Sequence, residues 1–260
     1  MKKFCAVYGL FKNEYRFLPL WIKYYSGLFG MENLYILDHC STDDSTKDLE
    51  CNVEIVGEKV SFCSDHHWIY KTMLDKHVEL LKEYKYVISV DADEFIFTTP
   101  KYENLKHYIE TNNEKSVRRP GIRRCTGYEI IQQPDEQALK WNKPILIKQR
   151  NRWIRLNTYD KESIVSKVTN WSMGRHFTHN KKHDPPDGNL ILCHLHRVDY
   201  EHCKEKYLFE NDVEKLDKIF PIFTNKSLFD SYFVEPNYHR QFQAMATTLK
   251  KIPKGFENII

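Results

Sequence analysis

Apolar and polar positions in the first hundred residues alternate between short apolar runs and longer amphipathic stretches. The apolar runs have strand length and cover 4–10, 34–37, 53–56 and 86–90. Between Asn13, a candidate N-cap, and Gly30, a candidate C-terminal stop, apolar residues recur at helical spacing. A second apolar stripe predicts a long helix over 67–84.

This order of strands and helices predicts an α/β fold with a mostly parallel, doubly wound central sheet flanked by helices. The second half is less regular. Its expected elements are a helix over 104–112, strands near 122–131, 144–147, 164–168 and 190–196, and helices near 200–209, 212–219 and 238–250. No repeat or linker divides the chain, so we expect a single domain over 1–260.

Polar clusters follow the predicted strands at 12–14, 38–44 and 91–94. The carboxyl ends of parallel strands meet at one edge of a sheet, so these clusters should lie together. In an extended chain Asp91 and Asp93 face the same side, and two hard carboxylates suit Mg²⁺ or Mn²⁺. An Asp-x-Asp sequence is also common in turns and solvated loops.

The formal net charge of +3 is far from the basicity expected of a protein that binds nucleic acid. Residues 115–155 nevertheless hold eleven Lys or Arg against three acids, a local excess of +8. This segment is either a solvated face or a wall that binds an anion such as a phosphate.

Seven cysteines without regular spacing favour reduced thiols and a cytoplasmic location. The apolar stretch from Phe4 to Phe11 ends at Lys12 without a cleavage site for a secretion signal. No apolar run approaches the roughly 20 residues that span a bilayer, so any membrane association would be peripheral.

Three polar clusters and one aromatic residue together resemble the motifs of a known enzyme family. They are Lys12-Asn13-Glu14, Leu37-Asp38-His39-Cys40-Ser41-Thr42-Asp43, Val90-Asp91-Ala92-Asp93-Glu94-Phe95, and Trp21 in the first predicted helix. In content and order they resemble the GT-A glycosyltransferases of the family 2 type. The resemblance covers about the first 100 residues. It implies a Rossmann-like GT-A fold with a nucleotide-binding half over 1–100 and an acceptor half over 101–260.

The resemblance also implies roles for individual residues. Asp38 corresponds to the acid that contacts the nucleotide base, Asp91 to a ribose or metal neighbour, and Asp93 to the direct metal ligand. Phe11, Asn13, Glu14 and Lys71 would also contact the donor. Asp38 could instead be an N-cap or an Asx-turn residue, and Lys71 could lie on a solvated helix face. His39-Cys40 departs from the family pattern, in which an acid or Asn is followed by Gly.

His194 and His196 share one face of the predicted strand over 190–196. GT-A enzymes often complete their metal site with a late histidine, and either residue resembles it in position. Core histidines remain an alternative. A zinc site that includes Cys193 and Cys203 is another, although no paired Cys-x-x-Cys spacing supports it.

An inverting transfer needs a carboxylate as general base. Asp184 and Asp187 lie in an Asp-Pro-Pro-Asp-Gly segment, 91 and 94 residues after Asp93, a separation similar to that in family 2 enzymes. Both could equally form turns, and Asp160 and Glu162 are reserve candidates.

The sequence therefore favours a glycosyltransferase that uses Mn²⁺ or Mg²⁺ to move a sugar from a nucleotide donor such as a UDP-sugar. The acceptor would be a glycan or another hydroxyl compound. One alternative is a nucleotidyltransferase, although the segment around Gly9 lacks a glycine-rich phosphate loop. The other is a carbohydrate-binding protein without catalytic activity.

Overall fold

The computed structural model of the chain describes residues 1–57, 66–112, 121–133, 135–171, 185–199, 201–202, 205, 249–256 and 260. The chain forms two compact units. The first comprises Met1–Tyr128, Leu156–His194 and Ile259–Ile260, and the second comprises Glu129–Arg155 and Leu195–Asn258. The units are interleaved in sequence. The single transferase domain over 1–260, with a nucleotide-binding half up to residue 100 and an acceptor half after it, stays a prediction.

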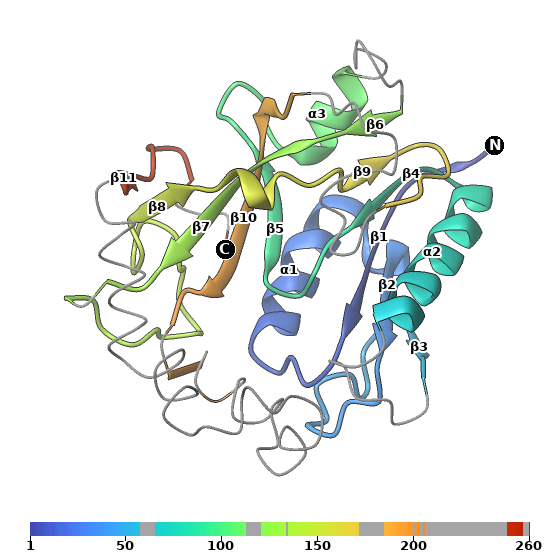
Figure 1. Cartoon of the computed structure of the whole chain (residues 1–260), viewed down its shortest axis with the longest axis horizontal. Helices are drawn as coiled ribbons and strands as arrows, with labels where there is room; N and C mark the ends of the chain where they lie inside the picture. Colours follow the sequence, from blue (N-terminus) through green and yellow to red (C-terminus); the bar gives the residue numbers. More distant parts are fainter. Residues whose placement is uncertain are drawn as a thin grey trace. The chain divides into compact units, whose positions relative to one another are not determined.

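A six-stranded sheet forms the centre of the first unit, in the order β3-β2-β1-β4-β9-β6 (Figure 1). Its strands are β1 (Lys3–Phe11), β2 (Leu34–Asp38), β3 (Asn52–Ile55), β4 (Tyr84–Ser89), β6 (Ile122–Arg123) and β9 (Ile164–Val165). The first four strands are parallel, as the sequence predicts.

The expectation of a mostly parallel sheet holds for these four strands only, because β9 is antiparallel to both β4 and β6. The sheet is therefore mixed. The two added strands come from the second half of the chain and are two residues long. Such strands can join the edge of a sheet without the crossover helix that a parallel neighbour requires.

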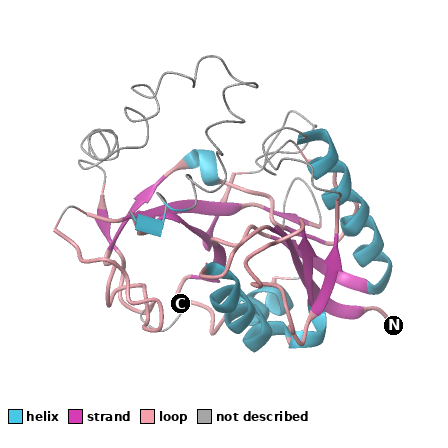
Figure 2. Ribbon diagram, turned by 90° about the horizontal axis from the view of Figure 1, so that it is seen from below, coloured by secondary structure: helices cyan, strands magenta, loops and turns pink. Residues whose placement is uncertain are grey.

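Two helices cover opposite faces of this sheet, α1 (Phe17–Phe29) and α2 (His66–Glu83) (Figure 2). Tyr8 of β1 and Met73 of α2 belong to one buried cluster. The neighbouring positions of β1 point the other way, and the ring of Phe11 lies 5.1 Å from that of Trp21 in α1. The alternation along β1 thus builds two core layers.

Helix α1 differs from the sequence-based expectation at its N-terminus and agrees with it at its C-terminus. Its N-cap is Arg16 without a side-chain hydrogen bond, so the prediction that Asn13 caps it is wrong. Asn13 instead binds the loop after β2. Gly30 does end the helix, at φ +91°, a conformation that favours glycine.

A second sheet has the order β11-β8-β7-β10-β5. Its strands are β5 (Glu94–Thr98), β7 (Cys125–Ile131), β8 (Arg152–Arg155), β10 (Asp187–Arg197) and β11 (Lys250–Lys251). In the first unit, β5 and β10 are antiparallel and pair His194 with Glu94. Helix α3 (Leu105–Thr111), which the sequence predicts, is capped by Asn104. The short 3-10 turns are η1 (Met31–Asn33) and η2 (Asn157–Tyr159).

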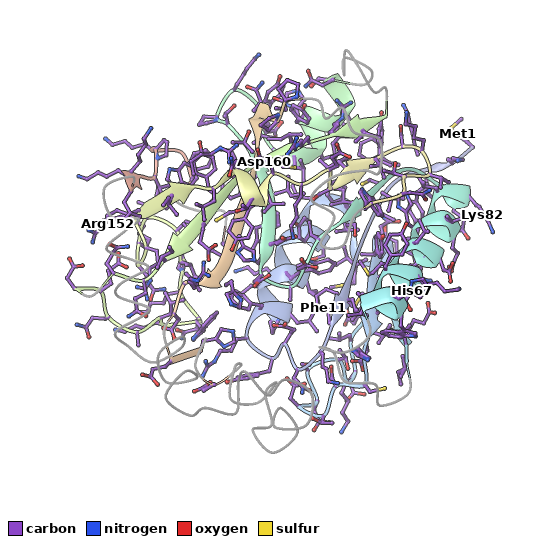
Figure 3. All side chains as sticks on the ribbon, in the orientation of Figure 1. Met1, Phe11, His67, Lys82, Arg152 and Asp160 are labelled. Atoms are coloured by element: carbon purple, nitrogen blue, oxygen red, sulfur yellow. The ribbon has the colours of Figure 1, made fainter. Side chains whose placement is uncertain are left out.

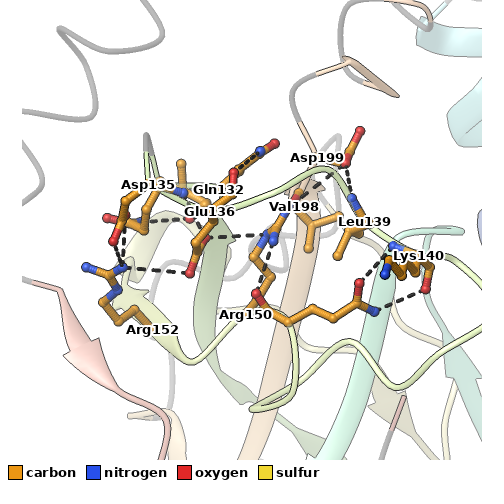
Figure 4. A network of polar contacts seen from close by, with 12 residues as sticks. Gln132, Asp135, Glu136, Leu139, Lys140, Arg150, Arg152, Val198 and Asp199 are labelled. Atoms are coloured by element: carbon orange, nitrogen blue, oxygen red, sulfur yellow. Dashed lines mark hydrogen bonds and ion pairs between the residues drawn. The ribbon is translucent and has the colours of Figure 1, made fainter.

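Among the described residues of the second unit, Arg150 organises a polar network (Figure 4). Its side chain is 2% exposed, and its Nε donates to the carbonyl of Val198 at 2.8 Å. Glu136 lies 3.5 Å from the same nitrogen, and Arg152 pairs with Asp135 at 3.2 Å. Arg150 and Arg152, two of the eleven basic residues in 115–155, are therefore paired with acids of the protein itself.

The predicted strand over 144–147 is wrong. This apolar segment forms a tight loop with one isolated bridge, Leu146 to Arg150, because Ile147 turns the chain at φ +65°. The helices expected over 200–209, 212–219 and 238–250 fall almost entirely outside the described residues. No helix in the described part of the chain is long and apolar enough to cross a membrane.

Candidate functional site

The loops after β1 and β2 are joined by hydrogen bonds at the carboxyl edge of the parallel strands. The backbone N–H of Asn13 donates to Ser41 Oγ at 3.0 Å, and Asn13 Oδ1 accepts from the N–H of Thr42 at 2.7 Å. Asn13 adopts φ +56°, a left-handed conformation that asparagine tolerates. Two of the predicted polar clusters therefore meet.

Asp38 is 5% exposed and holds the second of these loops together. Its Oδ1 accepts from the backbone N–H of Ser41 at 2.9 Å, and its Oδ2 accepts from the hydroxyl of Thr46 at 2.9 Å. The first bond spans three residues, one more than in an Asx turn, and has the reach of an N-cap bond, so Asp38 acts locally on its own loop. A contact between Asp38 and a nucleotide base stays a prediction.

The unusual His39-Cys40 pair keeps the backbone that glycine would provide. Cys40 adopts φ +52°, and its thiol donates to the carbonyl of Gly57 at 2.9 Å. His39 is buried, with its ring 4.8 Å from that of Trp68. Burial lowers the pKa of His39, and the nearby Lys12 lowers it further, so a neutral ring is favoured at this position.

Residues 91–94 form a turn, so the expected extended alternation of Asp91 and Asp93 does not occur. The N–H of Asp91 donates to Glu94 Oε2 at 3.1 Å, and the N–H of Glu94 donates to the carbonyl of Asp91 at 3.1 Å. The side chain of Asp91 is 44% exposed, whereas that of Asp93 is 8% exposed. The two carboxylates consequently have different partners.

Asp93 and His194 come together across the β5–β10 pairing. His194 Nε2 lies 3.7 Å from Asp93 Oδ2, and the His194 side chain is 12% exposed. The ring of Tyr159 lies 4.3 Å from the imidazole, tilted by 31°. His196 is two residues further along the same strand, is exposed, and belongs to the second unit.

Lys161 is a site residue that the sequence does not single out. Its side chain is 5% exposed, and its Nζ donates to Asp91 Oδ2 at 3.1 Å and to Glu94 Oε1. The one available signal is a polar stretch, Asp160 to Ser163, directly before the apolar pair at 164–165. That pattern indicates a loop and does not reveal which acids the lysine will meet.

The reserve acids near Lys161 have structural partners. Asp160 lies beside the 3-10 turn η2 (Figure 3), and its Oδ1 accepts from the N–H of Gly127 at 2.9 Å. A Cβ at Gly127 would collide with the backbone of Tyr159, so glycine permits this close approach. Glu162 is buried, and its carbonyl accepts from the indole N–H of Trp171 at 3.2 Å.

The structure does not bring Asp187 to the carboxylate turn. Asp187 begins β10, seven residues before His194, a separation of roughly 23 Å along a strand. Its Oδ1 accepts from the N–H of Asn189 at 2.8 Å, and its Oδ2 accepts from the hydroxyl of Tyr108. This environment favours a structural role for Asp187. Asp184 lies outside the described residues.

The other predicted donor contacts lie in different settings. Phe11 is buried at the end of β1 (Figure 3), and Glu14 is 7% exposed, with its carbonyl accepting from the N–H of Leu18. Lys71 lies on an exposed face of α2, 2.5 Å from Asp75. The surroundings of Lys71 therefore match the alternative interpretation, in which it lies on a solvated helix face.

The described residues contain no cluster of three or more His, Cys, Asp or Glu side chains that could hold a metal. Asp93 and His194 nevertheless fit as a pair of ligands, one carboxylate oxygen and one imidazole nitrogen at 3.7 Å. Mg²⁺ commonly binds through one or two protein carboxylates together with the phosphates of its substrate. The pair fits an ion that shares its coordination with a diphosphate.

The sequence matches no protein-family model and no curated protein. Seven chains of solved structures match. One is the mannosyltransferase Ktr4p from S. cerevisiae in complex with GDP, with 14% sequence identity and a TM-score of 0.26. The match covers 54% of this chain and 43% of that structure, so the chain spans less than half the length of that neighbour.

Proposed function

We propose that the protein is a glycosyltransferase that moves a sugar from a nucleoside diphosphate donor to a hydroxyl acceptor. The observation that carries the proposal is that Asp93, in the turn after β4, lies 3.7 Å from His194 of β10. It supports the resemblance to GT-A enzymes because it joins the second Asp of the Asp-x-Asp sequence to a late histidine from a distant strand.

In this proposal Asp93 and His194 hold a divalent ion, Mn²⁺ or Mg²⁺. When bound, such an ion neutralises negative charge on the departing diphosphate. His194 must present the lone pair of a neutral Nε2 to act as a ligand. The ring of Tyr159, 4.3 Å away, packs against the imidazole and restricts its orientation.

The nucleoside part of the donor would lie along the loops that Asn13 and Asp38 organise. Asp91 is the most exposed acid of the 91–94 turn, at 44%, so its carboxylate can accept hydrogen bonds from ribose hydroxyls. Phe11, Glu14 and Lys71 remain proposed donor contacts, and UDP remains the proposed nucleotide.

The acceptor would be a glycan or another hydroxyl compound, bound by the second half of the chain. The carboxylate that removes its proton must reach the acceptor hydroxyl. Asp187 and Asp184 stay predictions for this role. The hydrogen bonds of Asp187 with Tyr108 and Asn189 favour a search beginning with Asp184.

Release of nucleoside diphosphate from a panel of nucleotide sugars in Mn²⁺, with water or an added glycan as the acceptor of the sugar, tests the proposed activity. Wild-type protein should release the diphosphate from at least one donor, and Asp93→Asn should not. Asp135→Asn is the matched control, because Asp135 is an exposed aspartate that pairs with Arg152 in the second unit. Release of pyrophosphate from a nucleoside triphosphate instead would indicate a nucleotidyltransferase. Donor binding without turnover would indicate a carbohydrate-binding protein.

A further inference from the structure

Lys161 places a buried ammonium group inside the acidic turn. Its Nζ lies 3.1 Å from Asp91 Oδ2 and also bonds Glu94 Oε1, and its side chain is 5% exposed. A buried ammonium is costly unless it is paired, and here two carboxylates pair it. Glu94 is 0% exposed, so the lysine also compensates the most buried charge of the turn.

The backbone around Lys161 fixes its position. The carbonyl of Lys161 accepts from the N–H of Cys125 at 2.8 Å, and Asp160 Oδ1 accepts from the N–H of Gly127 at 2.9 Å. The carbonyl of Ser163 accepts from the N–H of Ser89 at 2.9 Å. Hydrogen bonds to β7 and β4 thus hold residues 160–163 in place. They fix the position of the Lys161 ammonium at the 91–94 turn.

The two acids of the Asp-Ala-Asp sequence consequently differ in their charge environment. Asp91 lies against the cation of Lys161, whereas Asp93 lies against the imidazole of His194. A divalent ion bound to Asp91 Oδ2 would lie close to the lysine ammonium, and two cations at such a separation repel strongly. The same repulsion is absent beside a neutral histidine.

We propose that Lys161 is a positioning residue that keeps Asp91 off the metal and reserves its carboxylate for the donor. The inference rests on the proposed function. The ion is then held by Asp93 and His194 with the donor diphosphate as the third partner, so the protein alone binds it weakly. Asp91 contributes to donor affinity through ribose hydroxyls.

Direct titration of Mn²⁺, followed by electron paramagnetic resonance without nucleotide, tests the metal part of this inference. The variant Lys161→Met with Glu94→Gln removes the buried pair as a unit, and a thermal melt checks its fold. Freed from the ammonium, the half-exposed side chain of Asp91 can turn toward the ion as an additional ligand, so Mn²⁺ affinity should rise at least about fivefold. Adding Asp91→Asn to this variant should remove the gain. A lysine with a purely structural role would leave Mn²⁺ affinity unchanged or lower it.

Three single variants serve as controls. Lys161→Arg retains a cation against Asp91, and Glu94→Gln retains the Lys161–Asp91 contact, so both should keep Mn²⁺ affinity near the wild-type value. Asp91→Asn alone should also leave Mn²⁺ affinity unchanged, while it weakens UDP binding in saturating Mn²⁺. Loss of Mn²⁺ affinity in Asp91→Asn, or equal Mn²⁺ affinity in wild type and the double variant, would overturn the inference.

The outcomes separate this inference from the proposed function. If neither UDP nor GDP binds the wild-type protein, the proposed donor is wrong. The Mn²⁺ titrations without nucleotide still decide whether Lys161 keeps Asp91 off the metal.

Discussion

Asp93 and His194 face each other at 3.7 Å although 101 positions separate them in the sequence. The antiparallel pairing of β5 with β10 places His194 opposite Glu94, one residue beyond Asp93. The register of two strands thus sets the spacing of the proposed ligand pair. A shift by one residue would turn His194 to the other face of the strand.

Replacement of Asp93 by Asn should lower turnover at least roughly a hundredfold, because the amide removes the charge that binds the ion while it keeps the shape of the side chain. The free energy of unfolding should change by less than about 1 kcal/mol. Initial rates and urea denaturation of the same preparations measure the two effects. Near-native turnover in a folded variant would refute the role of Asp93.

The two late histidines should behave differently. His194→Ala should weaken Mn²⁺ binding in the presence of nucleoside diphosphate at least about tenfold, because it removes a ligand. His196→Ala should leave it unchanged, because His196 is exposed and lies two residues beyond His194, roughly 7 Å along β10. Isothermal calorimetry compares the two variants. A loss for His196→Ala with none for His194→Ala would reverse the assignment.

Much of the first unit could be predicted from sequence because each element there carries a local signal. The apolar runs at 4–10 and 86–90 became β1 and β4, and Gly30 ends α1. The family resemblance indicated Asp93 with either His194 or His196, and only the structure places His194 beside Asp93 in a long-range pairing. Local patterning alone does not contain it.

Lys161 and Asp187 show why the rest could not be predicted. Lys161 meets acids 67 and 70 positions away, and a lone lysine in a polar stretch has the same pattern as a solvated one. Asp187 sits in a sequence typical of turns, yet it begins β10, where its N–H donates to the carbonyl of Arg124 and its carboxylate accepts from Tyr108 and Asn189. Both outcomes depend on strand register, which no local pattern specifies.

Asp187→Asn tests whether this residue is structural or catalytic. An amide keeps one oxygen to accept from Asn189 but loses the carboxylate that accepts from Tyr108, whose hydroxyl must then accept from a neutral amide, so stability should fall by about 1–3 kcal/mol. Turnover of the folded fraction should remain within about threefold of wild type. Urea denaturation and initial rates at low temperature report the two quantities. A drop in turnover of about a hundredfold or more with unchanged stability would restore the general-base role.

His77 should make stability depend on pH. Burial against Trp171, with the rings 4.3 Å apart, lowers the pKa of His77 to about 4, whereas an unfolded histidine titrates near 6.5. Below about pH 6.5 the unfolded chain therefore binds the proton more readily than the folded protein. The free energy of unfolding should therefore decrease as the pH is lowered, and this histidine alone should account for about 2 kcal/mol of the loss at pH 5.

The variant His77→Gln lacks this titration. Relative to its own value at pH 7.5, the variant should lose about 2 kcal/mol less than wild type by pH 5, as measured by urea denaturation at both pH values. Parallel pH profiles for the two proteins would show that His77 is not the source of the effect.

Binding of a nucleoside diphosphate in the presence and absence of a divalent ion tests the central claim most directly. Asp93 and the diphosphate are both negative, so without an ion they repel each other. Isothermal titration of UDP and of GDP into the wild-type protein should show binding of at least one nucleotide with Mn²⁺, and binding at least about tenfold weaker with EDTA. Equal affinity under the two conditions would contradict the account.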